Sequence, residues 1–318
     1  MARRPSQQIP RYRARRGGGG GIGGILRWLA RLVLGLFLFS ILWVALYRVV
    51  DPPVTATMIG DMVAGRGAER SWMGLDRVDR DMVRAAIGAE DSKFCAHNGF
   101  DLNAIQDAMK RNASGGRIRG GSTISQQTAK NVFLWQGGGY VRKGAEAWFT
   151  FLIEHLWGKR RIMEVYLNVA ETGVGTYGVN AGSIRYFGHD ASAMSGLEAA
   201  RIAAVLPLPK QRGAIAPKGF TKRYGNAIAA RIGMIGRDRL DACVYRGFEA
   251  PVSKAPPPPR KSLPEPGADY ETATPPPPAT SVDETPVAAP VDAPPAPEPA
   301  ASGNETASEP PAEPTPNP

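Results

Sequence analysis

The sequence predicts a mainly α-helical domain that lies between one membrane-spanning segment and a proline-rich tail. Three observations lead to this prediction. Apolar residues between positions 52 and 250 recur mostly at helical spacing, an uncharged apolar run lies near the N-terminus, and residues 251–318 hold 22 of the 29 prolines. We therefore divide the 318 residues into a basic, glycine-rich segment (1–24), a transmembrane helix (25–50), one folded domain (52–250) and a tail (251–318).

The apolar run reads LVLGLFLFSILWVALY, from Leu32 to Tyr47, and contains no charge. It is short against the roughly 20 residues that cross a bilayer, but arginines near both ends can snorkel to the interface, which Trp28, Trp43 and Tyr47 also suit. Eight arginines and no acid occur in residues 1–31, so we expect the N-terminus in the cytoplasm and the domain outside. A cleaved signal peptide is the alternative, but no clear small-x-small site directly follows Tyr47.

The proline-rich tail is acidic and the rest of the chain is basic. Residues 251–318 contain ten acidic and three basic residues, a net charge of −7, whereas the whole chain carries +10. We expect this tail to be disordered and partly polyproline II. The basic remainder suits an anionic membrane surface or a phosphate-bearing substrate, and an external location argues against nucleic acid.

Only two cysteines and three histidines occur, without the spacing of a zinc site. Cys95 and Cys243 lie outside the membrane on this topology, where a disulfide that closes a long loop can form. Two buried free thiols explain the same count.

Helical spacing is clearest in five stretches, separated by glycine-rich joints. These are Val83–Phe94, Thr123–Val132, Val141–Leu156, Arg161–Leu167 and Leu197–Val205. The stretch GVGTYG, Gly173 to Gly178, fits a dinucleotide-binding pattern but follows a helical segment and not a strand. We therefore interpret it as a turn.

The first predicted helix carries two adjacent carboxylates near its end. Val83, Ile87, Glu90 and Phe94 share one helical face, so Glu90 lies in the apolar stripe. Asp91 is rotated by roughly 100° and should face elsewhere. Burial would raise the pKa of Glu90 and make it a better base near neutral pH. The alternative is a helix-end glutamate paired with an arginine.

The stretch RIRGGSTISQQTAKN places positive charge around a helix start. Thr123 and Gln126 have capping-box spacing after a glycine pair. Glycines let backbone amides approach a ligand, and a helix N-terminus favours an anion such as phosphate. Arg117 and Arg119 precede the helix and Lys130 lies within it. A solvated basic loop before an ordinary capped helix is the alternative.

A third stretch, VRKGAEAWFTFLIEHLW, puts Arg142, Lys143 and Glu146 on one helical face. Many such triplets are surface ion pairs, but this one adds a second carboxylate next to more positive charge. Phe133, Leu134 and Trp135 flank a glycine joint and suit either the outer leaflet of a membrane or buried packing.

Taken together, four ordered blocks resemble the peptidoglycan glycosyltransferases (glycosyltransferase family 51), and within them the monofunctional biosynthetic transglycosylases. The blocks are AEDSKFCAHNGFD, GGSTISQQTAKN, RKGAE and KRRIMEVYLN, and the resemblance spans roughly residues 70–220. Cys95 stands where an aromatic residue is expected, and Ser125 and Thr128 are mild departures. None of these three positions has an expected chemical role.

The resemblance implies a lysozyme-like α fold that polymerises lipid II into β-1,4-linked glycan strands, with inversion and release of undecaprenyl pyrophosphate. It implies Glu90 as the general base and Glu146 as a second catalytic carboxylate that steers the donor sugar or the leaving group. No cofactor is obligatory, although Glu146 could act through a divalent cation, Mg or Mn. The residues implied to bind substrate and pyrophosphate are Ser122, Gln127, Lys130, Arg142 and Lys143, with Arg117 and Arg119. The residues implied to support the site are Asp91, His97, Glu164 and Asn168.

The same resemblance implies a single-pass protein of the bacterial inner membrane with a periplasmic catalytic domain. Its expected partners are lipid II, the growing glycan strand, and cell-wall synthesis or division proteins. No S-x-x-K and no K-T-G motif occurs, so we expect no transpeptidase activity. A lysozyme-type glycan-cleaving enzyme and a non-catalytic membrane-anchored scaffold are the two alternatives. The cluster of cations counts against the first, and the presence of both carboxylates counts against the second.

Overall fold

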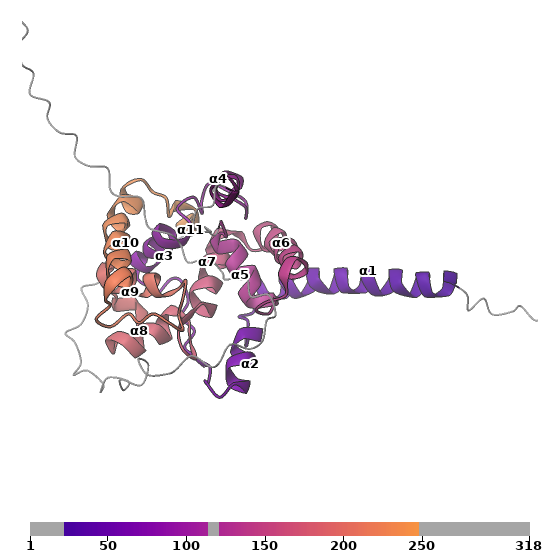
Figure 1. Cartoon of the computed structure of the whole chain (residues 1–318), viewed down its shortest axis with the longest axis horizontal. Helices are drawn as coiled ribbons and strands as arrows, with labels where there is room; N and C mark the ends of the chain where they lie inside the picture. Colours follow the sequence, from indigo (N-terminus) through magenta and orange to yellow (C-terminus); the bar gives the residue numbers. More distant parts are fainter. Residues whose placement is uncertain (1–21, 114–120, 248–318) are drawn as a thin grey trace, which may run out of the picture.

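The computed structural model describes residues 22–113 and 121–247, which are mostly helical (Figure 1). Arg117, Arg119 and the tail lie outside the described residues. The helices are α1 (Ile22–Tyr47), α2 (Ala56–Val63), α3 (Arg80–Glu90), α4 (Leu102–Ala113), α5 (Ile124–Phe133), α6 (Gly139–Leu156), α7 (Gly158–Val169), α8 (Val179–Phe187), α9 (Gly196–Val205), α10 (Gly219–Arg237), α11 (Ala242–Tyr245) and the 3₁₀ turn η1 (Ala191–Ala193). The predicted mainly α fold is confirmed.

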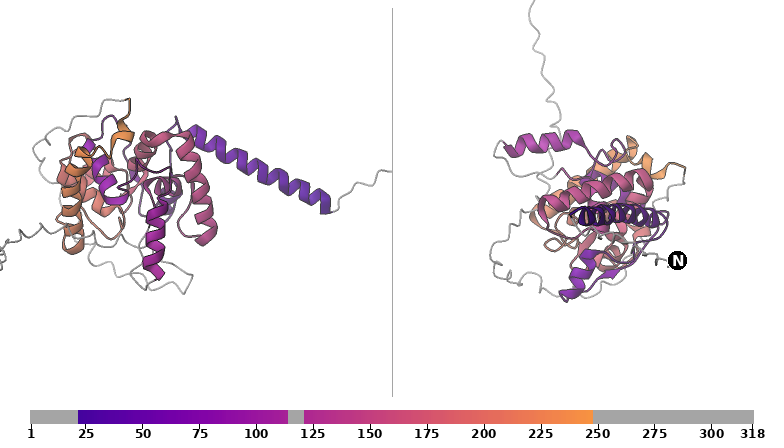
Figure 2. Two further views of the ribbon diagram at one scale, coloured as in Figure 1. Left: turned by 90° about the horizontal axis from the view of Figure 1, so that it is seen from above. Right: turned by 90° about the vertical axis from the view of Figure 1, so that its right-hand side faces the viewer.

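The N-terminal helix α1 leaves the domain as a straight rod on the side away from α9 and α10 (Figures 1 and 2). It is long and apolar enough to cross a membrane, and most of its side chains are exposed. Its C-terminal half packs on the domain, because Trp148 Nε1 donates to Ser40 Oγ at 3.1 Å and Trp157 Nε1 donates to the Val44 carbonyl at 2.7 Å. The anchor is thus bonded directly to α6 and the residue that follows it.

Aromatic rings fill the junction between α1 and the domain. The Phe133 ring stacks on Phe149 with centroids 4.7 Å apart and meets Trp43 edge-on at 5.2 Å. Phe133 and Leu134 are therefore buried, and of the three residues considered for membrane insertion only Trp135 is exposed. For Phe133 and Leu134 the buried alternative is correct.

The larger helices of the domain form two groups. Helices α3, α9 and α10 pack together on one side, and α5, α6 and α7 pack together on the side nearer α1. A small sheet of three short strands completes the domain, in the order β1 (Glu69–Arg70), β3 (Thr176–Tyr177) and β2 (Glu171–Gly173). Strand β3 is parallel to β1 and antiparallel to β2. The discarded dinucleotide pattern supplies the turn of this hairpin, as expected.

Local sequence signals predicted several helix boundaries. Helix α5 starts immediately after Thr123, whose side chain forms the expected capping box with Gln126. Helices α6, α7 and α9 begin within a few residues of the predicted positions. Helix α3, however, ends at Glu90 and does not continue to Phe94. This difference changes the surroundings of the adjacent carboxylate, Asp91.

Candidate active site

Glu90 is the last residue of α3 and lies partly buried between helices. Its Oε2 accepts a 2.8 Å hydrogen bond from Gln127 Nε2. Its Oε1 is buried and has no hydrogen-bond partner among the described residues. Burial raises the pKa of Glu90, and the Gln127 hydrogen bond and the positive charges of Lys130 and Arg212 oppose this shift. One carboxylate oxygen is therefore held in place and the other is left to accept a proton.

The neighbouring Asp91 faces inward as well, so the prediction that it faces elsewhere is wrong. Its side chain is 5 % exposed, His97 Nε2 donates to both of its oxygens at 3.0 Å, and the Ile124 amide donates to Oδ2 at 3.1 Å. His97 Nδ1 accepts from the Gly99 amide at 3.1 Å, which places the proton on Nε2. Because α3 ends at Glu90, the helical rotation of roughly 100° does not apply to Asp91.

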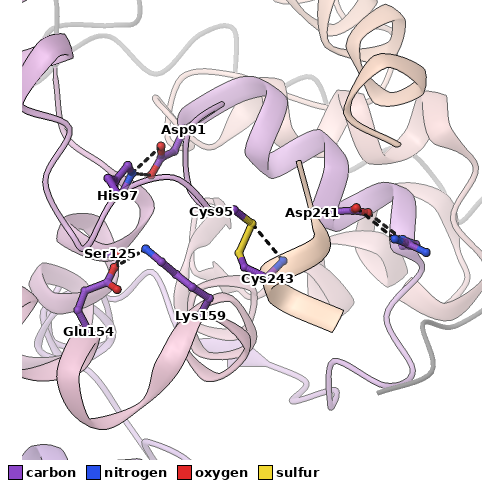
Figure 3. The surroundings of a disulfide bond; sticks show 9 residues. Asp91, Cys95, His97, Ser125, Glu154, Lys159, Asp241 and Cys243 are labelled. Atoms are coloured by element: carbon purple, nitrogen blue, oxygen red, sulfur yellow. Dashed lines mark hydrogen bonds and ion pairs between the residues drawn. A yellow bond between two sulfur atoms is a disulfide. The ribbon is translucent and has the colours of Figure 1, made fainter. Parts of the chain in front are cut away.

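Asp91 consequently links three segments of the site. It follows α3, it orders the loop that contains His97 (Figure 3), and it binds the first amide of α5. A carboxylate at this helix end also complements the positive end of the α5 dipole. Its contacts are those of a support for Glu90 and Gln127.

Lys130 lies three residues beyond Gln127 on α5 and is half-buried. Burial lowers the pKa of Lys130, the charge of Glu146 opposes that shift, and Arg142 and Lys143 reinforce it. Among the described residues, no hydrogen bond or ion pair engages its ammonium group. A partly desolvated cation in this position is suited to bind an anionic substrate group.

Glu146 is buried on α6 and is engaged by two cations. Arg142 Nη1 donates to its Oε2 at 2.6 Å, and Lys143 Nζ donates to its Oε1. Lys143 Nζ also lies 3.4 Å from Ser122 Oγ, just ahead of α5. The structure thus brings Ser122, Arg142, Lys143 and Glu146 together, as the motif positions imply.

The same contacts bear on a divalent cation at Glu146. Both carboxylate oxygens already accept from cationic side chains. Among the described residues, no group of three or more histidine, cysteine or acidic side chains is arranged to hold a metal ion. The residues present therefore do not fit an ion bound through Glu146.

Glu164 and Asn168 contact backbone and not the two site carboxylates. Glu164 Oε1 accepts from the Leu75 amide at 3.2 Å. Asn168 Oδ1 accepts from the Met73 amide at 2.8 Å and its Nδ2 donates to the Met73 carbonyl at 2.9 Å. Both side chains thus attach helix α7 to the segment that lies just before α3. This is a supporting position.

Sequence reasoning missed a cavity that adjoins these residues. A space of about 470 Å³ is lined by Gln127 and Lys130 on one side and by Glu171 and the segment 206–211 on the other. Burial raises the pKa of Glu171 to about 7, and Lys210, whose Nζ lies 3.8 Å from Glu171 Oε1, opposes this shift. No local signal marked Glu171, because it lies just before the stretch Gly173 to Gly178 that we interpreted as a turn.

Comparison with known proteins shows to which family the chain belongs. A family model described as "Transglycosylase" matches residues 56–232, which include every described site residue. The chain belongs to this transglycosylase family. A protein of Caulobacter vibrioides is 49% identical over 224 residues, which cover 69% of this chain and 98% of the relative. A protein of Xanthomonas axonopodis pv. citri is 44% identical over 237 residues, covering 72% of this chain and 93% of the relative.

Both relatives, and one from Rhodospirillum centenum that is 43% identical over 221 residues (69% of this chain and 96% of the relative), are named biosynthetic peptidoglycan transglycosylases. The resemblance predicted from the four sequence blocks is thus confirmed. The transglycosylase domain has the lysozyme-like α fold of its family. The chain is a peptidoglycan glycosyltransferase of cell-wall synthesis, and its apolar helix α1 fits a single-pass membrane anchor.

Proposed function

We propose that this transglycosylase polymerises lipid II into β-1,4-linked glycan strands, with inversion at the anomeric carbon and release of undecaprenyl pyrophosphate. One observation supports this most strongly. Glu90 presents a buried oxygen without a hydrogen-bond partner, and it lies in the field of Lys130, a half-buried cation whose ammonium group is also unengaged among the described residues. The pair supplies a base and an anion-binding group in one place.

In the proposed reaction Glu90 Oε1 takes the proton from the 4-hydroxyl of the acceptor N-acetylglucosamine. The oxygen then attacks the anomeric carbon of the growing chain's N-acetylmuramic acid. The new bond forms on the face opposite to the bond that breaks, so an α-linked donor gives a β-linked product. Gln127 holds the other carboxylate oxygen, which fixes the direction in which Glu90 faces.

The leaving pyrophosphate gains negative charge as the bond to the sugar breaks. We assign its stabilisation to Lys130, Arg142 and Lys143, with Ser122 beside Lys143 as a further donor. Glu146 holds Arg142 and Lys143 at the correct spacing through its two ion pairs. In this proposal Glu146 acts by orienting cations that steer the donor. Arg117 and Arg119 precede Ser122 in sequence and remain assigned to the same role.

The membrane arrangement follows from the same substrate. We propose that α1 crosses the bacterial inner membrane with the N-terminus in the cytoplasm, so that residues 52–250 form a periplasmic catalytic unit close to a lipid-linked substrate. In this proposal, other proteins crosslink the strands. Cell-wall synthesis or division proteins are the proposed partners.

A glycan-cleaving enzyme is the alternative with the same fold and paired carboxylates. It has no need of the cations around Lys130. To test this, the detergent-solubilised full chain is incubated either with labelled lipid II or with isolated glycan strands. The products are then separated by size. We expect lipid II to be converted into long polymer; intact lipid II together with shortened strands would support cleavage.

A further inference from the structure

The last turn of α3 is held by side chains from α10. The final carbonyl groups of a helix have no partner within the helix. Arg231 Nη1 donates to the Gly88 carbonyl at 3.0 Å, and the Tyr224 hydroxyl donates to the Ala89 carbonyl at 2.8 Å. These two carbonyls belong to the residues immediately before Glu90. The turn that carries the proposed base is thus capped from a helix more than a hundred residues later in the chain.

The two donors act from one surface of α10. Tyr224 and Arg231 are seven residues apart, close to two helical turns, so they project from the same face. Tyr224 is 5 % exposed. A Cβ atom on Gly88 would lie only 3.4 Å from Arg231 Cβ, which shows how closely the two helices approach. Loss of either donor would leave a partly buried carbonyl without its partner, at a cost in free energy.

Two further contacts join the C-terminal part of the domain to α3 and to the loop after it (Figure 3). Asp241 is fully buried and accepts from Arg80 at 2.8 Å and from Arg84 at 3.1 Å. The Cys95–Cys243 disulfide joins the loop after Glu90 to α11. The α10 contacts therefore hold the last turn of α3 together with the bonds that Gln127 makes to Glu90 and that Ile124 makes to Asp91.

We propose that Tyr224 and Arg231 are positioning residues for Glu90. By binding the two carbonyls that precede it, they hold the last turn of α3 so that the carboxylate stays buried against Gln127. This inference rests on the proposed role of Glu90 as the base. It assigns a function to α10, from which no side chain is assigned to the reaction itself.

The test uses the full chain in detergent and the initial rate of lipid II polymerisation. A displaced base lowers kcat more than it changes KM, so we expect Tyr224→Phe to lower kcat about tenfold or more with KM within about twofold. Tyr245→Phe is the matched control, because Tyr245 is 7 % exposed and its buried hydroxyl has no hydrogen-bond partner among the described residues. We expect this control to keep wild-type kinetics.

Two substitutions of Arg231 test the second donor. Arg231→Met should lower kcat as Tyr224→Phe does, whereas Arg231→Lys, which retains a charged donor, should recover most of the loss. A role in stability alone would lower the melting temperature of Arg231→Met without a specific rescue of kcat. If Tyr224→Phe fails to fold, the Arg231 pair decides the question.

The pH profile separates positioning from general destabilisation. The acidic limb of the pH profile of kcat/KM reports the pKa of the base in the free enzyme. A loosened turn admits water to Glu90 and weakens the effect of burial, so the limb should move to lower pH in Tyr224→Phe and stay in place in Tyr245→Phe. The other groups around Glu90 are unchanged in both variants, namely Gln127, Lys130, Tyr166, Arg212 and Asp91.

Wild-type kcat and an unmoved limb in both Tyr224→Phe and Arg231→Met would overturn the positioning role. So would a fall in kcat without a shift of the limb and without rescue by Arg231→Lys. The proposed function fails by a different result, which is polymerisation by Glu90→Gln. An inactive Glu90→Gln with fully active α10 variants would therefore refute this inference alone.

Discussion

Gln127 of α5 donates a 2.8 Å hydrogen bond to Glu90 Oε2 at the end of α3. The two residues are brought together because Asp91, next to Glu90, accepts from the Ile124 amide at the start of α5. Burial raises the pKa of Glu90, whereas this hydrogen bond favours its ionised form. The contact therefore fixes the direction of the carboxylate and opposes the shift of its pKa that burial causes.

Removing the amide donor should move the pH profile to higher values. In Gln127→Leu the ionised form of Glu90 loses a hydrogen bond, so its pKa rises and the acidic limb of kcat/KM should shift to higher pH. The measurement is the pH dependence of lipid II polymerisation. Gln106→Leu, on the exposed surface of α4, is the control. A limb that stays at the wild-type pH would contradict the assigned contact.

The ammonium group of Lys130 on α5 should contribute to activity and not to stability. Burial lowers the pKa of Lys130, which means that the folded protein disfavours its charge. Lys130→Met should therefore melt at the wild-type temperature or above, while polymerisation falls about a hundredfold or more. The exposed Lys110→Met is the control. Activity within twofold of wild type would remove Lys130 from the anion site.

The carboxylate of Glu171, which lines the cavity, should make the stability of the protein depend on pH. Because the pKa of Glu171 rises from 4.5 to about 7, the folded protein keeps a proton that the unfolded chain releases. The free energy of unfolding should then decrease as pH rises through this interval and level off above it. Glu171→Gln removes this loss, so it should be more stable than wild type at pH 8, by about 1 kcal/mol after allowance for solvent screening.

The measurement is thermal melting at pH 4 and pH 8, with the exposed Glu69→Gln on β1 as the control. Near pH 4 the two proteins should melt together, because Glu171 is then protonated in both folded and unfolded states. Equal stability of Glu171→Gln and wild type at pH 8 would mean that the Glu171 carboxylate is solvated and that burial does not raise its pKa.

The disulfide should contribute to stability through the length of chain that it closes. Cys95 and Cys243 are 148 positions apart, and a crosslink over such a loop reduces the entropy of the unfolded chain. A Cys95→Ala, Cys243→Ala double variant should lose about 2–5 kcal/mol of stability. Reductant should lower the melting temperature of wild type and leave that of the double variant unchanged. An identical response of both proteins would contradict the crosslink.

Helical spacing and capping chemistry predicted the elements that carry the cations. The start of α5 follows from Thr123 and Gln126, and the ion pairs of α6 follow from the spacing of Arg142, Lys143 and Glu146. These features depend on residues at most four positions apart. Such contacts can be inferred from a sequence because the geometry of a single helix determines them.

The surroundings of the adjacent carboxylates could not be predicted in this way. Asp91 is buried because of the Ile124 amide, which is 33 residues away, and the Glu90 turn is capped by Tyr224 and Arg231. Glu171 faces the cavity only because the segment 206–211 packs opposite. Each of these arrangements depends on tertiary contacts that no local pattern records.

The rate of lipid II polymerisation by Glu90→Gln tests the role of the proposed base most directly. The amide keeps the size of the side chain but cannot take the proton of the acceptor hydroxyl. We predict a folded protein, shown by an unchanged melting temperature, whose rate is about 10²- to 10⁴-fold below that of wild type at neutral pH. A folded Glu90→Gln that retains more than a few per cent of wild-type polymerisation would contradict this assignment.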